Sequence, residues 1–334
     1  MVGESLLINT FLLALGIILL VRSGIYVVHS LNAMARFMGV AQYTISFVLM
    51  AFATSLPELS VGINAAISGD SNLSLGNVLG TNIVNITFIL GVVVLIAGKV
   101  ILTDYADFVN TRVFNFLLII SPIVFLIDGT LSRFDGVVLL FFFLWNLSRI
   151  LKLREKFLDR DITSIFKREP ALKLGETKKS VRNFSKNLFI FSVGVTVLVG
   201  SSYLAVYSAS NLSLAIGIPK LLIGILIIGL GTSLPELAFG IRSAMEGRGD
   251  MAFGNLLGAA VTNSTLVLGV TAVIRPVHVF ESNIFWISAF FMAISMLLVY
   301  YFLRVKNFLV QREGLVLIFT YAVFILIQGF ANIV

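Results

Sequence analysis

Residues 51–91 read AFATSLPELSVGINAAISGDSNLSLGNVLGTNIVNITFILG, and residues 229–269 read GLGTSLPELAFGIRSAMEGRGDMAFGNLLGAAVTNSTLVLG. The two stretches align without a gap, and roughly two positions in five are identical. The offset is constant at 178 residues, both from Glu58 to Glu236 and from Asn85 to Asn263. Self-similarity at a fixed offset over such a length indicates an internally duplicated fold. The chain is therefore expected to consist of two related halves.

The composition predicts a membrane protein. Of 334 residues, 58% are hydrophobic and only 12% are charged, and apolar runs of roughly 20 residues, long enough to span hydrocarbon, recur from end to end. The net charge is +7, but the basic residues lie in the connections between apolar runs, where they orient a chain in a bilayer, so no nucleic-acid partner is expected. There is no cysteine and there are only two histidines, far apart, which excludes disulfide scaffolds and thiolate or imidazole metal sites. The sequence thus predicts an all-α, multi-pass protein of the cell membrane whose surroundings are the lipid bilayer.

About ten transmembrane helices are expected. Their approximate spans are 5–28, 41–68, 73–97, 111–128, 134–152, 186–207, 217–245, 250–272, 283–303 and 313–332. Five fall in a first half, residues 1–152, and five in a second half, residues 186–334, with the duplicated segments at about 41–97 and 217–272. Because five is an odd number, the second half enters the membrane inverted relative to the first, which is the plan of secondary transporters. The basic linker at 153–185 is expected to be cytoplasmic, which puts both termini outside.

Each repeat places a proline and a glutamate inside a membrane helix. Proline has no N–H and pushes against the carbonyl group four residues earlier, so Pro57 and Pro235 free backbone oxygens at about residues 53–54 and 231–232. Such oxygens need a partner in hydrocarbon, and a cation is one. Glu58 and Glu236 follow directly. A charged side chain at this depth costs at least ~2.5 kcal/mol, which favours a functional pair over a purely structural one.

Further oxygen ligands are predicted near the glutamates. Gly76-x-x-x-Gly80 and its copy allow helices to approach closely. The polar positions flanking the glutamates or following the glycines are Ser55, Ser233, Asn77, Thr81, Asn85, Asn255 and Asn263. For Asn77 and Asn255, a packing role and ligation both remain open, whereas the deeper Asn85 and Asn263 favour ligation. Calcium, which takes about 6 to 8 oxygens, fits this ligand set best, and sodium fits parts of it.

The paired Gly/Ala-Thr-Ser-Leu-Pro-Glu-Leu segments, each followed by Gly-Asn-x-x-Gly and a deep asparagine, resemble the alpha repeats of the calcium/cation antiporter superfamily, on its sodium/calcium exchanger branch. The resemblance implies a secondary antiporter that exchanges calcium for sodium by alternating access, with these ions as substrates and no cofactor. It also implies that Glu58 and Glu236 bind calcium directly. The other metal ligands it implies are Thr54, Thr232, Ser55, Ser233, Thr81, Asn85, Asn263, Ala51 and Gly229.

The resemblance further implies that the first and sixth helices slide over the core. The glycines that would permit this motion, or simply allow ordinary helix packing, are Gly16, Gly24, Gly194 and Gly200.

Two residues depart from the family pattern. Ala259 stands where the first repeat has Thr81, so one sodium position should lose a hydroxyl ligand. Asn263 stands where some relatives have aspartate, which leaves two carboxylates in the core and argues against potassium coupling.

Three alternatives were weighed against sodium/calcium exchange. A proton-coupled antiporter for calcium or another divalent cation could use the same glutamates, because carboxylates also exchange protons. An intramembrane enzyme is disfavoured, since the chain has no His-Glu-x-x-His pair, membrane Asp dyad or cysteine nucleophile. A passive cation channel could use carboxylates too, but proline-broken inverted repeats favour a carrier. The sequence does not specify an oligomeric state.

Overall fold

The computed structural model describes residues 2–37, 51–101, 105–165, 177–279, 282–306 and 308–330. Within these residues the protein is almost entirely helical. Six described helices are long and apolar enough to cross a bilayer, and they span Leu6–Leu31, Ser71–Ala97, Phe184–Ile216, Gly249–Ile274, Asn283–Arg304 and Gln311–Gly329. Another candidate span consists of Lys220–Thr232 and Leu234–Met245, two segments bent by 41° relative to each other. The prediction of an all-helical membrane protein is confirmed at this level.

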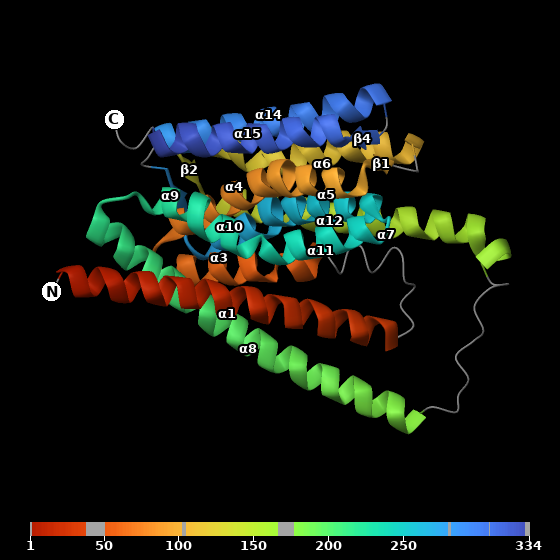
Figure 1. Cartoon of the computed structure of the whole chain (residues 1–334), viewed down its shortest axis with the longest axis horizontal. Helices are drawn as coiled ribbons and strands as arrows, with labels where there is room; N and C mark the ends of the chain where they lie inside the picture. The colour runs from red at the N-terminus through yellow and green to blue at the C-terminus, as the bar shows by residue number, and fades with distance from the viewer. Residues whose placement is uncertain are drawn as a thin grey trace.

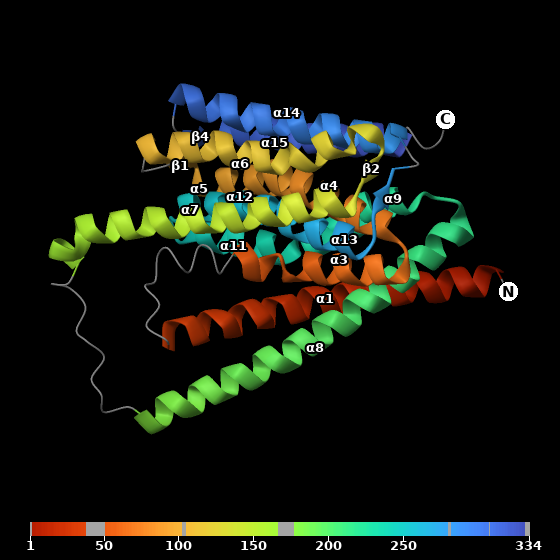
Figure 2. The same ribbon diagram turned by 180° about the vertical axis from the view of Figure 1, so that it is seen from behind.

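Two long helices lie side by side along one edge of the molecule (Figures 1 and 2). They are α1 (Val2–Phe37) and α8 (Thr177–Ile216), and they run in opposite directions. At Gly16 an added Cβ atom would lie only 3.0 Å from the backbone nitrogen of Ala205, so the pair packs closely at this point. Large apolar side chains on this pair, such as Phe11 and Phe189, are exposed in a way that suits contact with lipid.

The centre of the molecule consists of two sets of interrupted helices. The first set is α3 (Leu56–Ser68), α4 (Ser71–Val84), η1 (Asn85–Ile89) and α5 (Leu90–Ala97). The second set is α9 (Lys220–Ile223), η3 (Gly224–Ile228), α10 (Gly229–Thr232), α11 (Leu234–Met245), α12 (Gly249–Thr262), η4 (Asn263–Val267) and α13 (Leu268–Ile274). The segments η1, η3 and η4 are single π-helical turns within longer helices.

The two sets approach each other at glycines. A Cβ atom on Gly76 would lie 2.2 Å from the Leu221 carbonyl oxygen, and one on Gly80 would lie 2.2 Å from that of Ile225. No side chain fits at either position, so α4 lies directly against α9 and η3. The predicted role of Gly76 and Gly80 in close helix packing is confirmed.

Four longer helical segments and two small sheets surround this centre (Figure 1). The helical segments are α6 (Tyr105–Phe125), continued by the short 3-10 turn η2 (Leu126–Asp128), α7 (Arg133–Ile165), α14 (Ser282–Lys306) and α15 (Gln311–Phe330). The strands are β1 (Lys99–Ile101), β2 (Thr130–Leu131), β3 (Val277–His278) and β4 (Phe308–Val310). Strand β1 pairs with β4, and β2 with β3, both antiparallel. Each sheet therefore joins one strand from the first half of the chain to one from the second.

The offset of 178 residues extends beyond the sequence repeat into the tertiary contacts. An added Cβ atom on Gly314 would lie 3.0 Å from the Gly91 carbonyl oxygen, and one on Gly136 would lie 2.9 Å from the Gly269 carbonyl oxygen. Both members of the second pair are related to the first pair by the same offset, with the halves exchanged.

Helix α7 and helix α15 also begin in the same way. The Asp135 carboxylate accepts the Ser132 N–H at 2.8 Å, and the Glu313 carboxylate accepts the Val310 N–H at 2.7 Å. These residues again differ by 178 positions. The two halves therefore share packing contacts and helix-start hydrogen bonds as well as motifs.

Several helices are longer than expected. Helix α1 continues to Phe37, and α7 and α8 extend into the expected linker at 153–185, to Ile165 and from Thr177. Lysine, arginine and glutamate, which are common there, are good helix formers, so a membrane helix can continue past the apolar run that a hydropathy window detects. Residues 41–50 of the expected span 41–68, and residues 166–176 of the linker, lie outside the described residues.

Candidate cation site

Both repeats interrupt their helix just before the glutamate. The Ser55 N–H donates to the Ala51 carbonyl at 3.2 Å, and the Ser55 hydroxyl donates to the same oxygen at 2.9 Å. In the second repeat the Ser233 N–H and hydroxyl donate to the Gly229 carbonyl at 3.3 and 2.6 Å. The predicted ligand carbonyls of Ala51 and Gly229 thus already accept hydrogen bonds that hold the breaks together.

The prolines explain why the helices break at these positions. Pro57 and Pro235 lack the N–H that a regular helix would direct at the carbonyl groups of Ala53 and Gly231. Helix α1 lies over both breaks, since an added Cβ atom on Gly24 would lie 3.1 Å from Pro57 and 3.7 Å from Pro235. The breaks of the two repeats therefore meet beneath a single point of α1.

Glu58 and Glu236 are fully buried, each with 0% exposure. Within the described part of the chain, none of their four carboxyl oxygens has a hydrogen-bond partner. The two carboxyl groups are also close enough to repel each other electrostatically. Two unpaired, mutually repelling carboxylates in a low-dielectric interior are unfavourable unless a cation or protons neutralise them.

A threonine from the opposite repeat lies beside each glutamate. The Thr232 hydroxyl is next to Glu58, and the Thr54 hydroxyl is next to Glu236. Both hydroxyls donate elsewhere, Thr54 to the Ala51 carbonyl at 3.3 Å and Thr232 to Asn77 Oδ1 at 3.0 Å. Carboxylate and hydroxyl oxygens from the two halves thus come together in a crossed arrangement.

Helix α4 contributes Asn77 and Thr81 to this centre. The Thr81 hydroxyl lies 3.1 Å from the Thr232 hydroxyl and 3.1 Å from the Gly229 carbonyl oxygen. The second repeat has no equivalent of this contact, because Ala259 replaces Thr81. Asn255, the counterpart of Asn77, is buried, and neither of its amide atoms has a partner among the described residues. The loss of one hydroxyl predicted from Ala259 is thus visible as an asymmetry between the halves.

Asn85 and Asn263 each stand at the first position of a π-helical turn, η1 and η4. Both are fully buried, and π-helical turns frequently mark functional sites. Asn85 has no partner for either amide atom among the described residues, and Asn263 has none for its oxygen. The two deep asparagines therefore still offer oxygen atoms for ligation.

The donor set fits a hard cation. The carboxyl, hydroxyl, amide and carbonyl groups around the two breaks all offer oxygen atoms, and such sets suit calcium and sodium better than soft metals. Elsewhere in the described residues, no group of three or more histidine or acidic side chains gathers around a common point. The pair Glu58 and Glu236 is thus the feature of the described interior that attracts a cation.

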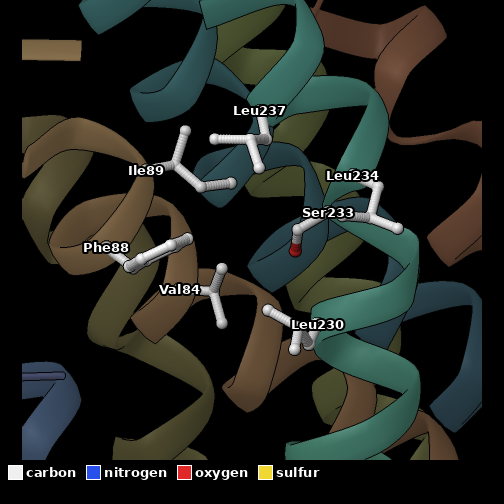
Figure 3. Close-up of a pocket in the computed structure, with 7 residues that line it drawn as sticks. All are labelled: Val84, Phe88, Ile89, Leu230, Ser233, Leu234 and Leu237. Carbon is white, nitrogen blue, oxygen red and sulfur yellow. The ribbon is translucent and has the colours of Figure 1, made fainter. Parts of the chain in front are cut away.

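A small pocket adjoins the second break (Figure 3). It lies between η1–α5 and α10–α11, and its lining residues are Val84, Phe88, Ile89, Leu230, Ser233, Leu234 and Leu237. Ser233 is the one polar side chain in this lining, and its hydroxyl donates to the Gly229 carbonyl. An apolar pocket of this kind does not bind a cation, so it is separate from the oxygen-rich centre.

Two polar clusters beside the centre were missed in the sequence. In the first, Asn82 donates to Ser264 at 2.9 Å and accepts from Asn263 at 3.5 Å. In the second, Ser202 of α8 lies 2.7 Å from the Ser60 hydroxyl and 2.6 Å from the Asn64 amide nitrogen, both on α3. Neither cluster is repeated at the 178-residue offset, so a search for duplicated motifs passes over them. Their signal is polar residues at membrane depth that the other half lacks.

The glycines implicated in sliding differ in their surroundings. At Gly194 a Cβ atom would lie 2.8 Å from Val27, so Gly194, like Gly16 and Gly24, packs tightly against its neighbours. Gly200 has no atom within 4 Å of the position a Cβ would take. Close packing therefore accounts for three of the four glycines.

Several membrane-spanning helices around a duplicated pair of buried carboxylates define a multi-pass membrane carrier of cations. The chain belongs to the sodium/calcium exchanger protein family, whose model matches residues 8–151 and 186–330. Members of this family are transporters, so this chain is a cation antiporter and not an enzyme.

Individual relatives agree with this family. The chain is 32% identical to the inner membrane protein YrbG of Escherichia coli, over 81% of each protein. It is 28% identical to the sodium/calcium exchanger MaX1 of Methanosarcina acetivorans, over 96% of this chain and 98% of MaX1.

Two solved exchangers have similar structures. The sodium-calcium exchanger NCX_Mj is 26% identical and superposes with a TM-score of 0.64, covering 95% of this chain and 97% of that one. The H+/Ca2+ exchanger CAX superposes with a TM-score of 0.75 at 18% identity, covering 95% and 82%. The likeness to CAX concerns the fold alone.

Proposed function

We propose that this protein exchanges sodium for calcium across the membrane by alternating access. The observation that carries the proposal is the crossed pair of buried glutamates, whose four oxygens lack partners in the described residues. One calcium ion, or more than one sodium ion, neutralises both carboxylates. The relatives named as sodium/calcium exchangers support sodium as the counter-ion.

The cation ligands in this proposal come from both repeats. Glu58 and Glu236 bind calcium, and the hydroxyls and backbone around the breaks complete its shell. The remaining ligands for calcium and sodium are Thr54, Thr232, Ser55, Ser233, Thr81, Asn85, Asn263, Ala51 and Gly229. Their burial and proximity support this set, and the hydrogen bonds now held by Ala51 and Gly229 require a small rearrangement when a cation binds.

The proposed architecture is two inverted halves of five helices each, residues 1–152 and 186–334. The antiparallel run of α1 and α8 and the contacts repeated at an offset of 178 residues support it. The family model also leaves a gap between residues 151 and 186 that coincides with the expected linker at 153–185. We place this basic linker in the cytoplasm and both termini outside.

Electrostatics makes the exchange obligatory in this mechanism. An empty site would carry two unpaired carboxylates through an occluded state of low dielectric, which is costly. A site loaded with calcium or sodium is neutralised and passes through that state more readily. Each ion must therefore be replaced by another before the site returns to the opposite side.

A proton-coupled antiporter for calcium or another divalent cation is the second candidate. Buried carboxylates can be neutralised by protons as well as by sodium, and the fold also resembles that of an H+/Ca2+ exchanger. Both candidates use the same glutamates, so only the counter-ion separates them.

Calcium-45 uptake into proteoliposomes tests the proposal. Vesicles loaded with sodium are compared with vesicles loaded with potassium or choline and with vesicles under an imposed pH gradient, for the wild type, Glu58→Gln and Glu246→Gln. Glu246 is a surface carboxylate paired with Arg242, and it controls for the loss of one negative charge. We expect sodium-dependent uptake that Glu58→Gln abolishes and Glu246→Gln retains. Uptake driven only by the pH gradient would support the second candidate, and uptake without a counter-ion would refute antiport.

A further inference from the structure

Asn263 is connected to a chain of hydrogen bonds that ends at a backbone carbonyl. The Ser264 hydroxyl donates to the Ile119 carbonyl at 3.0 Å, the Asn82 amide nitrogen donates to the Ser264 oxygen at 2.9 Å, and the Asn263 amide nitrogen donates to the Asn82 oxygen at 3.5 Å. The three side chains are at most 1% exposed and come from α4 and η4, while Ile119 belongs to α6.

The direction of every bond in this chain follows from its last member. A backbone carbonyl can only accept, so Ser264 must spend its single proton on Ile119 and can only accept from Asn82. Asn82 must then turn its NH2 group toward Ser264, which leaves its carbonyl oxygen facing Asn263. Asn263 must present its NH2 group to that oxygen, and its own oxygen is left at the far end. The amide orientation of Asn263 is thus fixed by chemistry and does not depend on which way an amide happens to be drawn.

The oxygen at the end of this chain is buried and has no partner among the described residues. Its turn, η4, packs against α3, the helix that begins beside Glu58. A fixed, unpaired oxygen in this place is an arrangement for a cation, because a buried acceptor without a donor is otherwise costly.

The first repeat has no such chain. At the 178-residue offset, Ala260 takes the place of Asn82 and Ile86 takes the place of Ser264. Asn85 accordingly has no hydrogen-bond partner in the described residues for either amide atom. Its amide is free to present either its oxygen or its nitrogen to the centre.

We propose that Asn82 and Ser264 are positioning residues that hold the Asn263 side-chain oxygen toward the cation site, which makes Asn263 a fixed ligand and Asn85 an adjustable one. This proposal rests on the proposed function for the location of the site but not on the identity of the counter-ion. Groups that orient metal ligands typically change metal affinity about 10- to 100-fold when they are removed. For a neutral amide ligand, the lower end of this range, about tenfold, is expected.

The test uses the full-length protein purified in detergent and measures equilibrium binding of calcium-45 and its displacement by sodium. Asn82→Leu and Ser264→Ala each interrupt the chain at a different residue. Asn146→Leu, on α7, and Ser121→Ala, on α6, remove a similar group outside the chain and serve as controls. We expect the first two variants to weaken calcium binding or sodium displacement about tenfold, and the controls to leave both unchanged.

A merely structural role is separated by combining variants. In an Asn263→Ala background, Asn82→Leu and Ser264→Ala should have no further effect on either affinity, because the ligand they orient is gone. Equal losses with and without Asn263, or wild-type affinities for both ions in the single variants, would overturn the proposal. Thermal unfolding of each variant identifies any that lose affinity by failing to fold. A wild-type protein that binds calcium but does not transport it would contradict the proposed function while leaving this inference testable.

Discussion

Ser202→Ala should loosen the contact between α8 and α3 and shift the protein toward a conformation in which these helices separate. The Ser202 hydroxyl is fully buried, lies 2.7 Å from the Ser60 hydroxyl and accepts the Asn64 amide N–H at 2.6 Å. Both bonds connect the two helices, so a movement of α8 along the core must break them. Alanine removes both bonds and leaves the helical backbone unchanged.

The expected magnitude follows from those two bonds. Hydrogen bonds between membrane helices contribute about 0.6 kcal/mol each on average and about 1.7 kcal/mol at most. The loss of two average bonds is about 1.2 kcal/mol, which corresponds to roughly an eightfold change in the equilibrium between the packed and separated conformations. If the bonds form only in the packed conformation, the whole change appears as a larger separated population.

A single introduced cysteine reports this population, because the chain contains no native cysteine. Ala65 is buried in the cluster between α3 and α8 and becomes the labelling site as Ala65→Cys. With a water-soluble thiol reagent, Ser202→Ala should label roughly eight times faster. Ser201→Ala is the matched control, since the Ser201 hydroxyl bonds only within its own helix, to the Leu198 carbonyl. Equal labelling rates in the two variants would refute the idea that the Ser202 bonds hold these helices together.

Two further substitutions test the packing and the asymmetry of the centre. Gly80→Ala should lower the stability of the protein by about 1–3 kcal/mol or more, because the new Cβ atom would lie 2.2 Å from the Ile225 carbonyl oxygen. Gly200→Ala, in open space, should not lower the melting temperature in detergent, and a Gly80→Ala protein as stable as wild type would contradict the close packing. Ala259→Ser should restore the hydroxyl that Thr81 supplies in the first repeat and strengthen sodium binding about 2- to 10-fold. Displacement of bound calcium-45 by sodium measures this change, and an unaltered sodium dependence would mean that position 259 does not contact the ion.

The duplicated features of this protein could be predicted from its sequence. Pro57 and Pro235 located the helix breaks, and the breaks occur at Ser55 and Ser233, within two residues of each proline. Gly76 and Gly80 indicated where helices touch, and their missing side chains are filled by carbonyl oxygens. These features depend on one residue type with one dominant physical consequence, so a motif suffices to predict them.

Features that join distant elements could not be predicted in this way. The chain from Ile119 through Ser264 and Asn82 to Asn263 needs three elements in register, and no local pattern records which helix faces which. The π-helical turns at Asn85 and Asn263 likewise leave no signal in hydrophobic periodicity, because one extra residue in a turn is within the tolerance of any helical pattern. Sequence reasoning could place both asparagines deep in the membrane but could not find that they are oriented differently.

The unrepeated contacts have a consequence for the two access states. If the halves of an inverted repeat were identical, exchanging their conformations would convert one access state into the other at no cost in free energy. Here the bond between α3 and α8 has no counterpart, because Gly24 stands at the position equivalent to Ser202, and Arg242 at that equivalent to Asn64. The conformation in which α3 packs on α8 therefore gains hydrogen bonds that the opposite conformation lacks. We expect the empty carrier to rest in that conformation, and the two sides of the membrane to differ in apparent calcium affinity as a result. The Ser202→Ala variant should bring those two affinities closer together, since it removes the bonds that only one state contains.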